Sequence, residues 1–484
     1  MSGTILNIFF QETNRPFRHG VIRRFVFRSN KTNAFRRSSD PGIEMAEYPG
    51  IFLSPVNKWI QLQYSTFVLF CLAAAADPVL KAGCRAPIML GMDTQELNAV
   101  KSQVGDEINR HQADMRILSN RIHSHPEIAM NEHQAAAWLT QELETLGFRI
   151  ERGTCGLPTA FRATYGTGKP TIAFIAEYDA LPGLGHACGH NLIATAAVAA
   201  GIGTQKAVDK FGGTVQVIGT PAEEMTGGKI IMARQGAFTG IDAAMMMHPA
   251  SLDSAMITAL ACVALDVEFF GKEAHAAAHP ELGINALEAM ILSFNAINSL
   301  RQHISTDSRV HGVITDGGKA ANIVPAYSAG RFLVRAGDTR YLNSLKKRVL
   351  NCFEASAQAT GARLEYRWDD QEYYAPMRNN VTLARLYVEN MERTGHSVPL
   401  FNASQSFGST DMGNVSQIVP SIHTSVSIAP PGEGEHTAEF ARSAAQEHGL
   451  TQSLAAAAGL AMTAVDLLSS PDTLAAVRME FDKT

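Results

Sequence analysis

The stretch that decides the fold is residues 177–191, which read EYDALPGLGHACGHN. Acidic side chains, a thiol and imidazoles are concentrated in this one segment. The residues before it, 171–176, are apolar and partly β-branched, which predicts a buried strand. The Ala-rich residues after it, 192–202, predict a helix. A loop between the carboxyl end of a strand and the start of a helix is where α/β proteins collect ligands and catalytic groups.

Cys188 and His190 flank a single glycine within this loop. A thiolate and an imidazole together suit Zn²⁺ or another borderline-soft divalent ion. The alternative is a loop that holds a buried cysteine and ordinary polar histidines. The choice between these two interpretations depends on what the other strand ends supply.

Two further predicted strands also end at residues that can bind a metal. Residues 213–220 lead to Glu223 and Glu224, and residues 241–247 lead to His248. Side chains alternate in an extended segment, so one of the two carboxylates can bind a metal while the other stays free for proton transfer. Three successive strand ends that supply Cys/His, Glu/Glu and His favour a metal centre over isolated polar residues.

Composition limits the class of protein. The chain has 484 residues, of which 46% are hydrophobic and 18% charged, as in a globular protein with more than one domain. A net charge of −5 gives no reason to expect nucleic-acid binding, and no apolar run reaches the roughly 18–20 residues of a membrane span. Scattered cysteines favour a reducing compartment, so we expect a cytoplasmic protein. The Arg-rich, acid-poor segment 15–37 leaves a mitochondrial transit peptide as the alternative.

The order of predicted elements divides the chain. Residues 262–375 follow a strand-helix-strand-strand-helix-strand order, which is ferredoxin-like α+β, and we predict a second domain inserted into the first. The flanking segments, 92–261 and 376–470, then form one α/β domain. We predict that residues 1–91 are an extension that packs poorly, and that residues 471–484 are a C-terminal tail.

Three local predictions concern helix ends and one loop. The apolar spacing over residues 94–123 is helical throughout. Asn131 is an N-cap candidate for a second helix that runs through Leu146 and ends before Gly147. Residues 416–420 are short and apolar, which favours an extended segment.

A set of motifs occurs in the order that one family of enzymes carries them. They are YDALP at 178–182, HACGH at 186–190, PAEE at 221–224, GKEAH at 271–275, NIVP at 322–325 and STD at 409–411. With this set the chain resembles the M20 metallopeptidases over roughly residues 92–470. Within that family it is similar to the amidohydrolase branch of aminobenzoyl-glutamate hydrolases, auxin-conjugate hydrolases and the M20 domain-containing protein 2 group.

The resemblance implies an α/β catalytic domain with a central mixed sheet that holds two metal ions. It also implies an inserted ferredoxin-like lid domain that usually forms a homodimer. By its motif position, Cys188 resembles the ligand that bridges the two ions. The remaining ligands implied by the resemblance are His190, Glu224, His248 and His436. Zn²⁺ is the expected ion, with Mn²⁺ and Co²⁺ as alternatives.

Other residues take roles from the same resemblance. Glu223 matches the general base, and Asp179 matches an acid that orients the metal ligands. His275 and Asn322 match lid residues that close over the substrate, the histidine often reaching the site of a partner subunit. Two further residues match substrate-binding positions. They are Arg335, whose counterpart in the family holds a substrate carboxylate, and Asp411.

The resemblance implies hydrolysis of an amide bond in a small dipeptide, such as β-alanyl-lysine, or in an acyl or aryl conjugate of an amino acid. A related enzyme dedicated to a secondary metabolite is one alternative, and a non-catalytic metal-binding relative is another. Retention of Glu223 beside every candidate ligand argues against the non-catalytic relative, because a binding protein does not need the free carboxylate. A serine hydrolase is disfavoured because the chain lacks a Gly-x-Ser-x-Gly elbow on a strand-to-helix turn.

Overall fold

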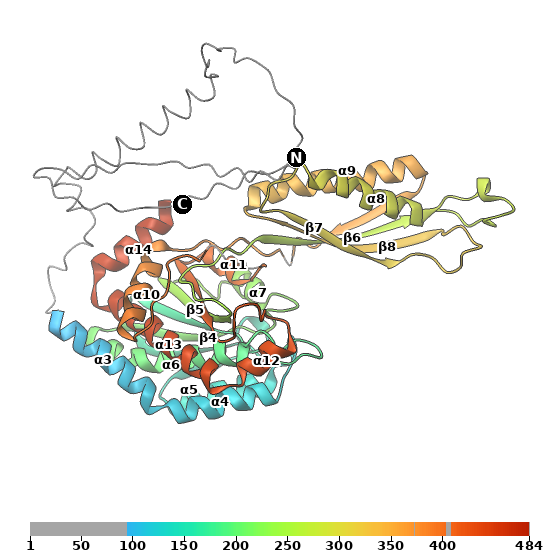
Figure 1. Ribbon diagram of the computed structural model, residues 1–484. Helices are drawn as coiled ribbons and strands as arrows, with labels where there is room; N and C mark the ends of the chain where they lie inside the picture. The colour runs from blue at the N-terminus through green and yellow to red at the C-terminus, as the bar shows by residue number, and fades with distance from the viewer. Residues whose placement is uncertain (1–93, 372, 403–407, 484) are drawn as a thin grey trace, which may run out of the picture. The chain divides into compact units, whose positions relative to one another are not determined.

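The computed structural model describes residues 94–371, 373–402 and 408–483, which form two sheets and the helices that cover them (Figure 1). The extension predicted at residues 1–91 lies outside the described residues.

The first sheet is mixed, with the strand order β1-β2-β4-β3-β5-β10. β1 and β2 pair antiparallel at one end, whereas β4, β3, β5 and β10 run parallel to one another. Every residue of β3 is buried, as expected for a strand that is covered on both faces. Because parallel strands end at the same edge, the loops that follow them converge there. The strands are β1 (Arg149–Arg152), β2 (Phe161–Thr167), β3 (Thr171–Ala176), β4 (Gly213–Gly219), β5 (Ala243–Ala250) and β10 (Ser421–Ser427).

Helices pack on this sheet around a single apolar core. α6 packs against β3, β4 and β5 and against α13, and it is largely buried (Figure 1). A Cβ at Gly201 of α6 would lie 2.6 Å from Cγ2 of Val217 in β4, so only glycine lets the helix approach that strand so closely. These helices are α3 (Thr94–Arg110), α4 (Gln112–Ser124), α5 (His133–Thr145), α6 (His190–Phe211), α7 (Gly228–Arg234), α10 (Val381–Arg393), α11 (Met412–Ser416), α12 (Ala438–Ala444), α13 (Glu447–Ser469) and α14 (Pro471–Lys483).

By length and composition, α13 could cross a membrane. However, 83% of its most apolar window is buried inside the protein. It packs against α6, α10 and α3, which makes it a central helix of this core.

The second sheet is antiparallel, with the order β7-β8-β6-β9 and helices α8 and α9 packed on it. This order and the sequence β-α-β-β-α-β are ferredoxin-like. The sheet has its own core, in which the rings of Phe332 and Phe353 meet edge to face with centroids 4.9 Å apart. Its elements are β6 (Ala261–Phe270), α8 (Ala286–Arg301), β7 (Arg309–Asp316), β8 (Tyr327–Ala336), α9 (Thr339–Thr360) and β9 (Arg363–Trp368). The predicted fold class, a mixed α/β sheet with a separate α+β unit, is confirmed.

The structure corrects the local prediction at Asn131. α5 begins at His133, and the Asn131 side chain donates to the carbonyl of Ala129 instead of capping the helix. The first amides of α5 donate to the carboxylate of Glu127, at 2.9 Å from Gln134 and 3.0 Å from Ala135. A carboxylate from the preceding loop therefore replaces the predicted local cap.

Three other segments also differ from the prediction. The helical segment 94–123 is divided into α3 and α4 at His111. The end of α11 lies at Ser416, so the segment 416–420 does not begin as a strand. The predicted tail forms α14, which packs on α10 and α13. A short apolar run does not by itself distinguish a strand from the end of a helix.

Candidate metal centre

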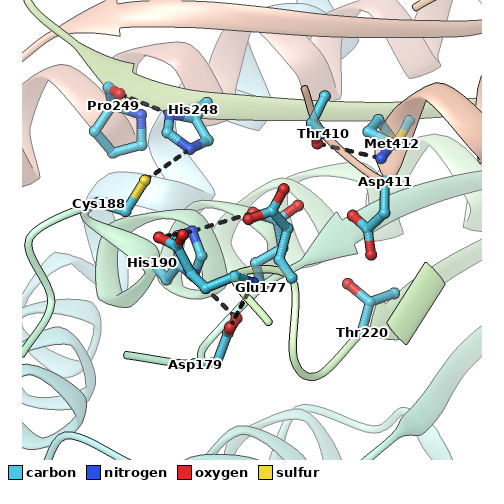
Figure 2. A network of polar contacts seen from close by, with 12 residues as sticks. Glu177, Asp179, Cys188, His190, Thr220, His248, Pro249, Thr410, Asp411 and Met412 are labelled. Carbon is cyan, nitrogen blue, oxygen red and sulfur yellow. Dashed lines mark hydrogen bonds and ion pairs between the residues drawn. The ribbon is translucent and has the colours of Figure 1, made fainter. Parts of the chain in front are cut away.

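The carboxyl-terminal edge of the parallel strands gathers the side chains that can hold metal ions (Figure 2). The donor atoms of Cys188, His190 and His248 all lie within 4.8 Å of one another, and so do those of Cys188, Glu224 and His436. Cys188 is common to these two groups, and His190, Glu223 and Glu224 form a third group within the same distance. A thiolate shared by two groups could contact two ions, and the bridging role of Cys188 stays a prediction.

Hydrogen bonds fix which nitrogen of each imidazole faces the site. Nδ1 of His190 donates to Oδ1 of Asp179 at 3.0 Å, and Nδ1 of His248 donates to the carbonyl of Pro249 at 2.7 Å (Figure 2). Nε2 of each ring therefore lies toward the other candidate donors. Nε2 of His248 lies 3.5 Å from Sγ of Cys188, and Nε2 of His190 lies 3.9 Å from Oε1 of Glu224. Partners of this kind usually orient the histidine ligands of metal sites.

The chemistry of these donors fits a divalent cation. Nε2 of His190 is buried and makes no hydrogen bond with the described residues, and Oε1 of Glu224 is buried with Nε2 of His436 3.3 Å away. Burial raises the pKa of the Cys188 thiol well above its usual value, so a thiolate there needs a cation beside it. Nitrogen, sulfur and carboxylate donors are ligand types that divalent transition-metal ions take in proteins.

Glu223 belongs to neither cysteine group, but its carboxylate lies within 4.8 Å of the donor atoms of His190 and Glu224. It lines a cavity of about 750 Å³, together with Cys188, His248 and His436. Burial, and then the nearby carboxylates of Glu177 and Asp411, raise its pKa well above the usual value. A carboxylate with a raised pKa suits a group that accepts and returns a proton.

A buried lysine behind the site was missed by the sequence reasoning. Nζ of Lys229 lies 2.6 Å from a carboxylate oxygen of both Glu177 and Asp411, and all three side chains are fully buried. Burial, and then the nearby carboxylate of Glu177, raise the pKa of Asp411 to about 6, although the ammonium group of Lys229 lowers it. The available signal was a single lysine within the apolar stretch 228–232.

Arg335 of β8 lines the same cavity, so residues from both sheets contribute to it. Nη1 of Arg335 donates to Oγ of Ser409 at 2.9 Å. The guanidinium is therefore held at a cavity that the candidate metal ligands Cys188, Glu224, His248 and His436 also line.

Three predicted residues lie elsewhere. His275 and Asn322 are both exposed and lie side by side, with the amide of Ala276 donating to the carbonyl of Asn322 at 3.0 Å. Neither is among the residues that line the cavity, so their roles stay predictions. Asp411 also does not line it, and its observed contacts are with Lys229.

Comparison with known proteins adds a family to this geometry. Residues 173–458 match peptidase family M20/M25/M40. The chain is also 38% identical over 403 residues to the mouse Xaa-Arg dipeptidase, covering 80% of this chain and 93% of that protein. The chain belongs to the M20 family.

Other members of the M20 family give the same assignment. One of the subunits of the Escherichia coli p-aminobenzoyl-glutamate hydrolase is 37% identical over 287 residues, covering 55% of this chain and 60% of that protein. A Bacillus subtilis structure, described as a dinuclear metal binding peptidase from this family, superposes with a TM-score of 0.59 at 19% identity. The superposition covers 74% of this chain and 99% of the Bacillus subtilis chain. The chain is thus an M20 hydrolase, as its motifs predicted.

Proposed function

We propose that this M20 hydrolase cleaves the amide bond of a small dipeptide or N-acyl amino acid whose leaving part carries a free carboxylate. The observation that carries the proposal is one cavity that is lined by Glu223, by candidate metal ligands and by Arg335. A volume of about 750 Å³ suits a substrate of dipeptide size.

The residues would divide the reaction as follows. Cys188, His190, Glu224, His248 and His436 would hold two divalent ions, most favourably Zn²⁺, whose charge would polarise the amide carbonyl and acidify water. Glu223 would accept the proton of the attacking water and return it to the leaving nitrogen. Arg335 would bind the substrate carboxylate through its planar, doubly donating guanidinium.

Finer features of the M20 relatives also belong to the proposal. The name of the mouse relative supports dipeptides with a basic C-terminal residue as the first substrates to try. We further propose a homodimer formed through the second sheet, with His275 acting at the partner's site, and a cytoplasmic location.

The test uses protein purified with its metal and a panel of amides. The panel contains β-alanyl-lysine, an Xaa-Arg dipeptide, an N-acyl amino acid and aminobenzoyl-glutamate, each also with its carboxylate amidated. We expect about two ions per chain and metal-dependent cleavage of the free acids. Glu223→Gln should keep the ions and lose turnover, whereas the exposed control Glu144→Gln should keep both.

Arg335 provides the sharper part of the test. Arg335→Ala should raise KM for the free acid and leave the amidated substrate unchanged, so the preference for the acid disappears. Full activity in Glu223→Gln, or an unchanged preference in Arg335→Ala, would overturn the corresponding role. Bound metal without cleavage of any substrate would favour a non-catalytic relative or an enzyme dedicated to a metabolite outside the panel.

A further inference from the structure

Glu132 is a buried carboxylate that joins the start of α5 to the segment carrying Glu223. Its side chain is fully buried. Oε1 accepts hydrogen bonds from the amide of Met130 at 3.0 Å and from the amide of Ala222 at 2.9 Å. Oε2 accepts from Oγ1 of Thr159 at 2.9 Å. One carboxylate thus links three segments that are distant in sequence.

The two amides that share Oε1 belong to residues with unusual backbone conformations. Met130 has φ of 62° and Ala222 has φ of 59°, in the left-handed region that residues with a side chain seldom adopt. Such a conformation persists where the surrounding contacts enforce it. The bond to Glu132 is a contact of that kind at both positions.

Ala222 directly precedes the two glutamates of the site. On the far side of Glu223, the amide of Glu224 donates to Oδ2 of Asp179 at 3.0 Å. Tyr374 donates its hydroxyl to the carbonyl of Glu223 at 3.1 Å. The backbone around Glu223 is therefore held from both sides, and Glu132 supplies the contact on the amino-terminal side.

We propose that Glu132 is a positioning residue for the reaction: by holding Ala222 in the left-handed conformation, it directs the carboxylate of Glu223 into the cavity. This inference rests on the proposed function, in which Glu223 transfers the proton. Glu132 itself lies outside the cavity and acts only through the backbone of Ala222. A purely structural role, the joining of α5 to Thr159, is the competing explanation.

Two glycine substitutions separate these explanations. Glycine adopts the left-handed region freely, so Ala222→Gly should make that segment independent of Glu132. Met130→Gly is the matched control, because Met130 donates to the same oxygen and has the same strain but does not adjoin Glu223. A structural role predicts that both substitutions rescue a Glu132 variant alike.

The experiment measures kcat, KM, bound metal and thermal stability for Glu132→Ala alone and with each glycine substitution. We expect Glu132→Ala to keep its metal and lower kcat about 10²-fold with little change in KM, since small misplacements of reacting groups have effects of this size. The loss should shrink to about tenfold or less with Ala222→Gly and stay near 10²-fold with Met130→Gly. The proposal would be overturned if Glu132→Ala lowered kcat equally alone, with Ala222→Gly and with Met130→Gly. It would also be overturned if both glycine substitutions restored kcat to the same extent.

Further variants keep the test decisive. Glu132→Gln retains an oxygen that accepts from both amides, so it should keep kcat within about tenfold of the wild type. If Glu132→Ala does not fold, Glu132→Asp withdraws the carboxylate by one methylene and should show the same dependence on Ala222.

Hydrogen exchange gives a readout that does not depend on turnover. Amides of residues 220–226 should exchange faster in the Glu132→Ala protein than in the wild type. Faster exchange in a chain that cleaves no substrate would reject the proposed function and leave the backbone contact standing. Unchanged exchange would reject the contact even in an active enzyme.

Discussion

Lys229→Met removes the ammonium group that two buried carboxylates share. In the wild type, Nζ lies 2.6 Å from an oxygen of Glu177 and 2.6 Å from one of Asp411. Methionine has a similar length and shape, so the change removes charge with little loss of packing. Two carboxylates with no solvent exposure then lose their shared counter-ion.

The expected effect on stability follows from burial. Removing one partner of a buried ion pair typically lowers the free energy of unfolding by about 3–5 kcal/mol, because the remaining charge stays desolvated. Here two carboxylates remain, so we expect the upper part of that range at pH 8. The backbone amide of Lys229 still donates to Asp411 at 2.9 Å, which limits the loss.

The loss should depend on pH in a direction that the pKa values set. Burial raises the pKa of Asp411 to about 6, above its unfolded value of about 3.9, so the folded state binds the extra proton. Stability from that proton is present at low pH and lost as the pH rises through the folded pKa. Without Lys229 the folded pKa rises further. The difference between variant and wild type should therefore be about 1–2 kcal/mol smaller at pH 5.5 than at pH 8.

Urea unfolding in the presence of a chelator measures this difference, because metal binding then adds nothing to the stability of either protein. Lys206→Met is the control, since Lys206 is largely exposed and lies 3.9 Å from Asp209. It should change the free energy of unfolding by less than about 0.5 kcal/mol. A loss below about 1 kcal/mol for Lys229→Met, or a loss equal at both pH values, would refute the argument.

Two further predictions concern other buried contacts. Asp466→Ala should lower the free energy of unfolding by about 3–5 kcal/mol in urea, because Nζ of Lys101 lies 2.6 Å away and is buried, while Asp466→Leu with Lys101→Met should lose much less. Gly189→Ala should weaken metal binding about 10–100-fold in a chelator competition, because its Cβ would lie 2.8 Å from Cγ of Pro249. Gly183→Ala has a similar positive φ without a contact within 4 Å, and it should bind metal like the wild type.

The elements that determine the fold could be predicted from local patterns. The apolar run at 171–176 is bounded by Pro170 and Glu177, and it forms β3 with the predicted ends. The order of strands and helices from residue 262 onward is enough to define the ferredoxin-like unit. Its first strand, β6, could be recognised because buried and partly exposed residues alternate along it. The grouping of the candidate metal ligands could be predicted because parallel strands end at one edge of the sheet, so residues distant in sequence become neighbours in space.

The supporting residues could not be predicted in the same way. Lys229 meets Asp411 across 182 residues, and Glu132 meets Ala222 across 90. A buried lysine or glutamate looks like a surface residue until its partner is known, since these residues are usually exposed. The prediction of an N-cap for α5 at Asn131 was wrong for a related reason. The first amides of the helix bind the carboxylate of Glu127, which lies in the loop before the helix.

The balance of buried charge offers an argument for metal ions that is independent of the spacing of ligands. Several carboxylates are buried close to one another at the strand ends, and Lys229 is the ammonium group in contact with two of them. An unpaired buried carboxylate normally becomes protonated, which would remove a ligand or a base from the site. Contacts with Lys229, His190 and His436 already hold the pKa values of Glu177, Asp179 and Glu224 below their usual values. Burial and neighbouring carboxylates raise the pKa values of Glu223 and Asp411 instead. Divalent cations would help to keep Glu223 ionised, and this favours ions at the site.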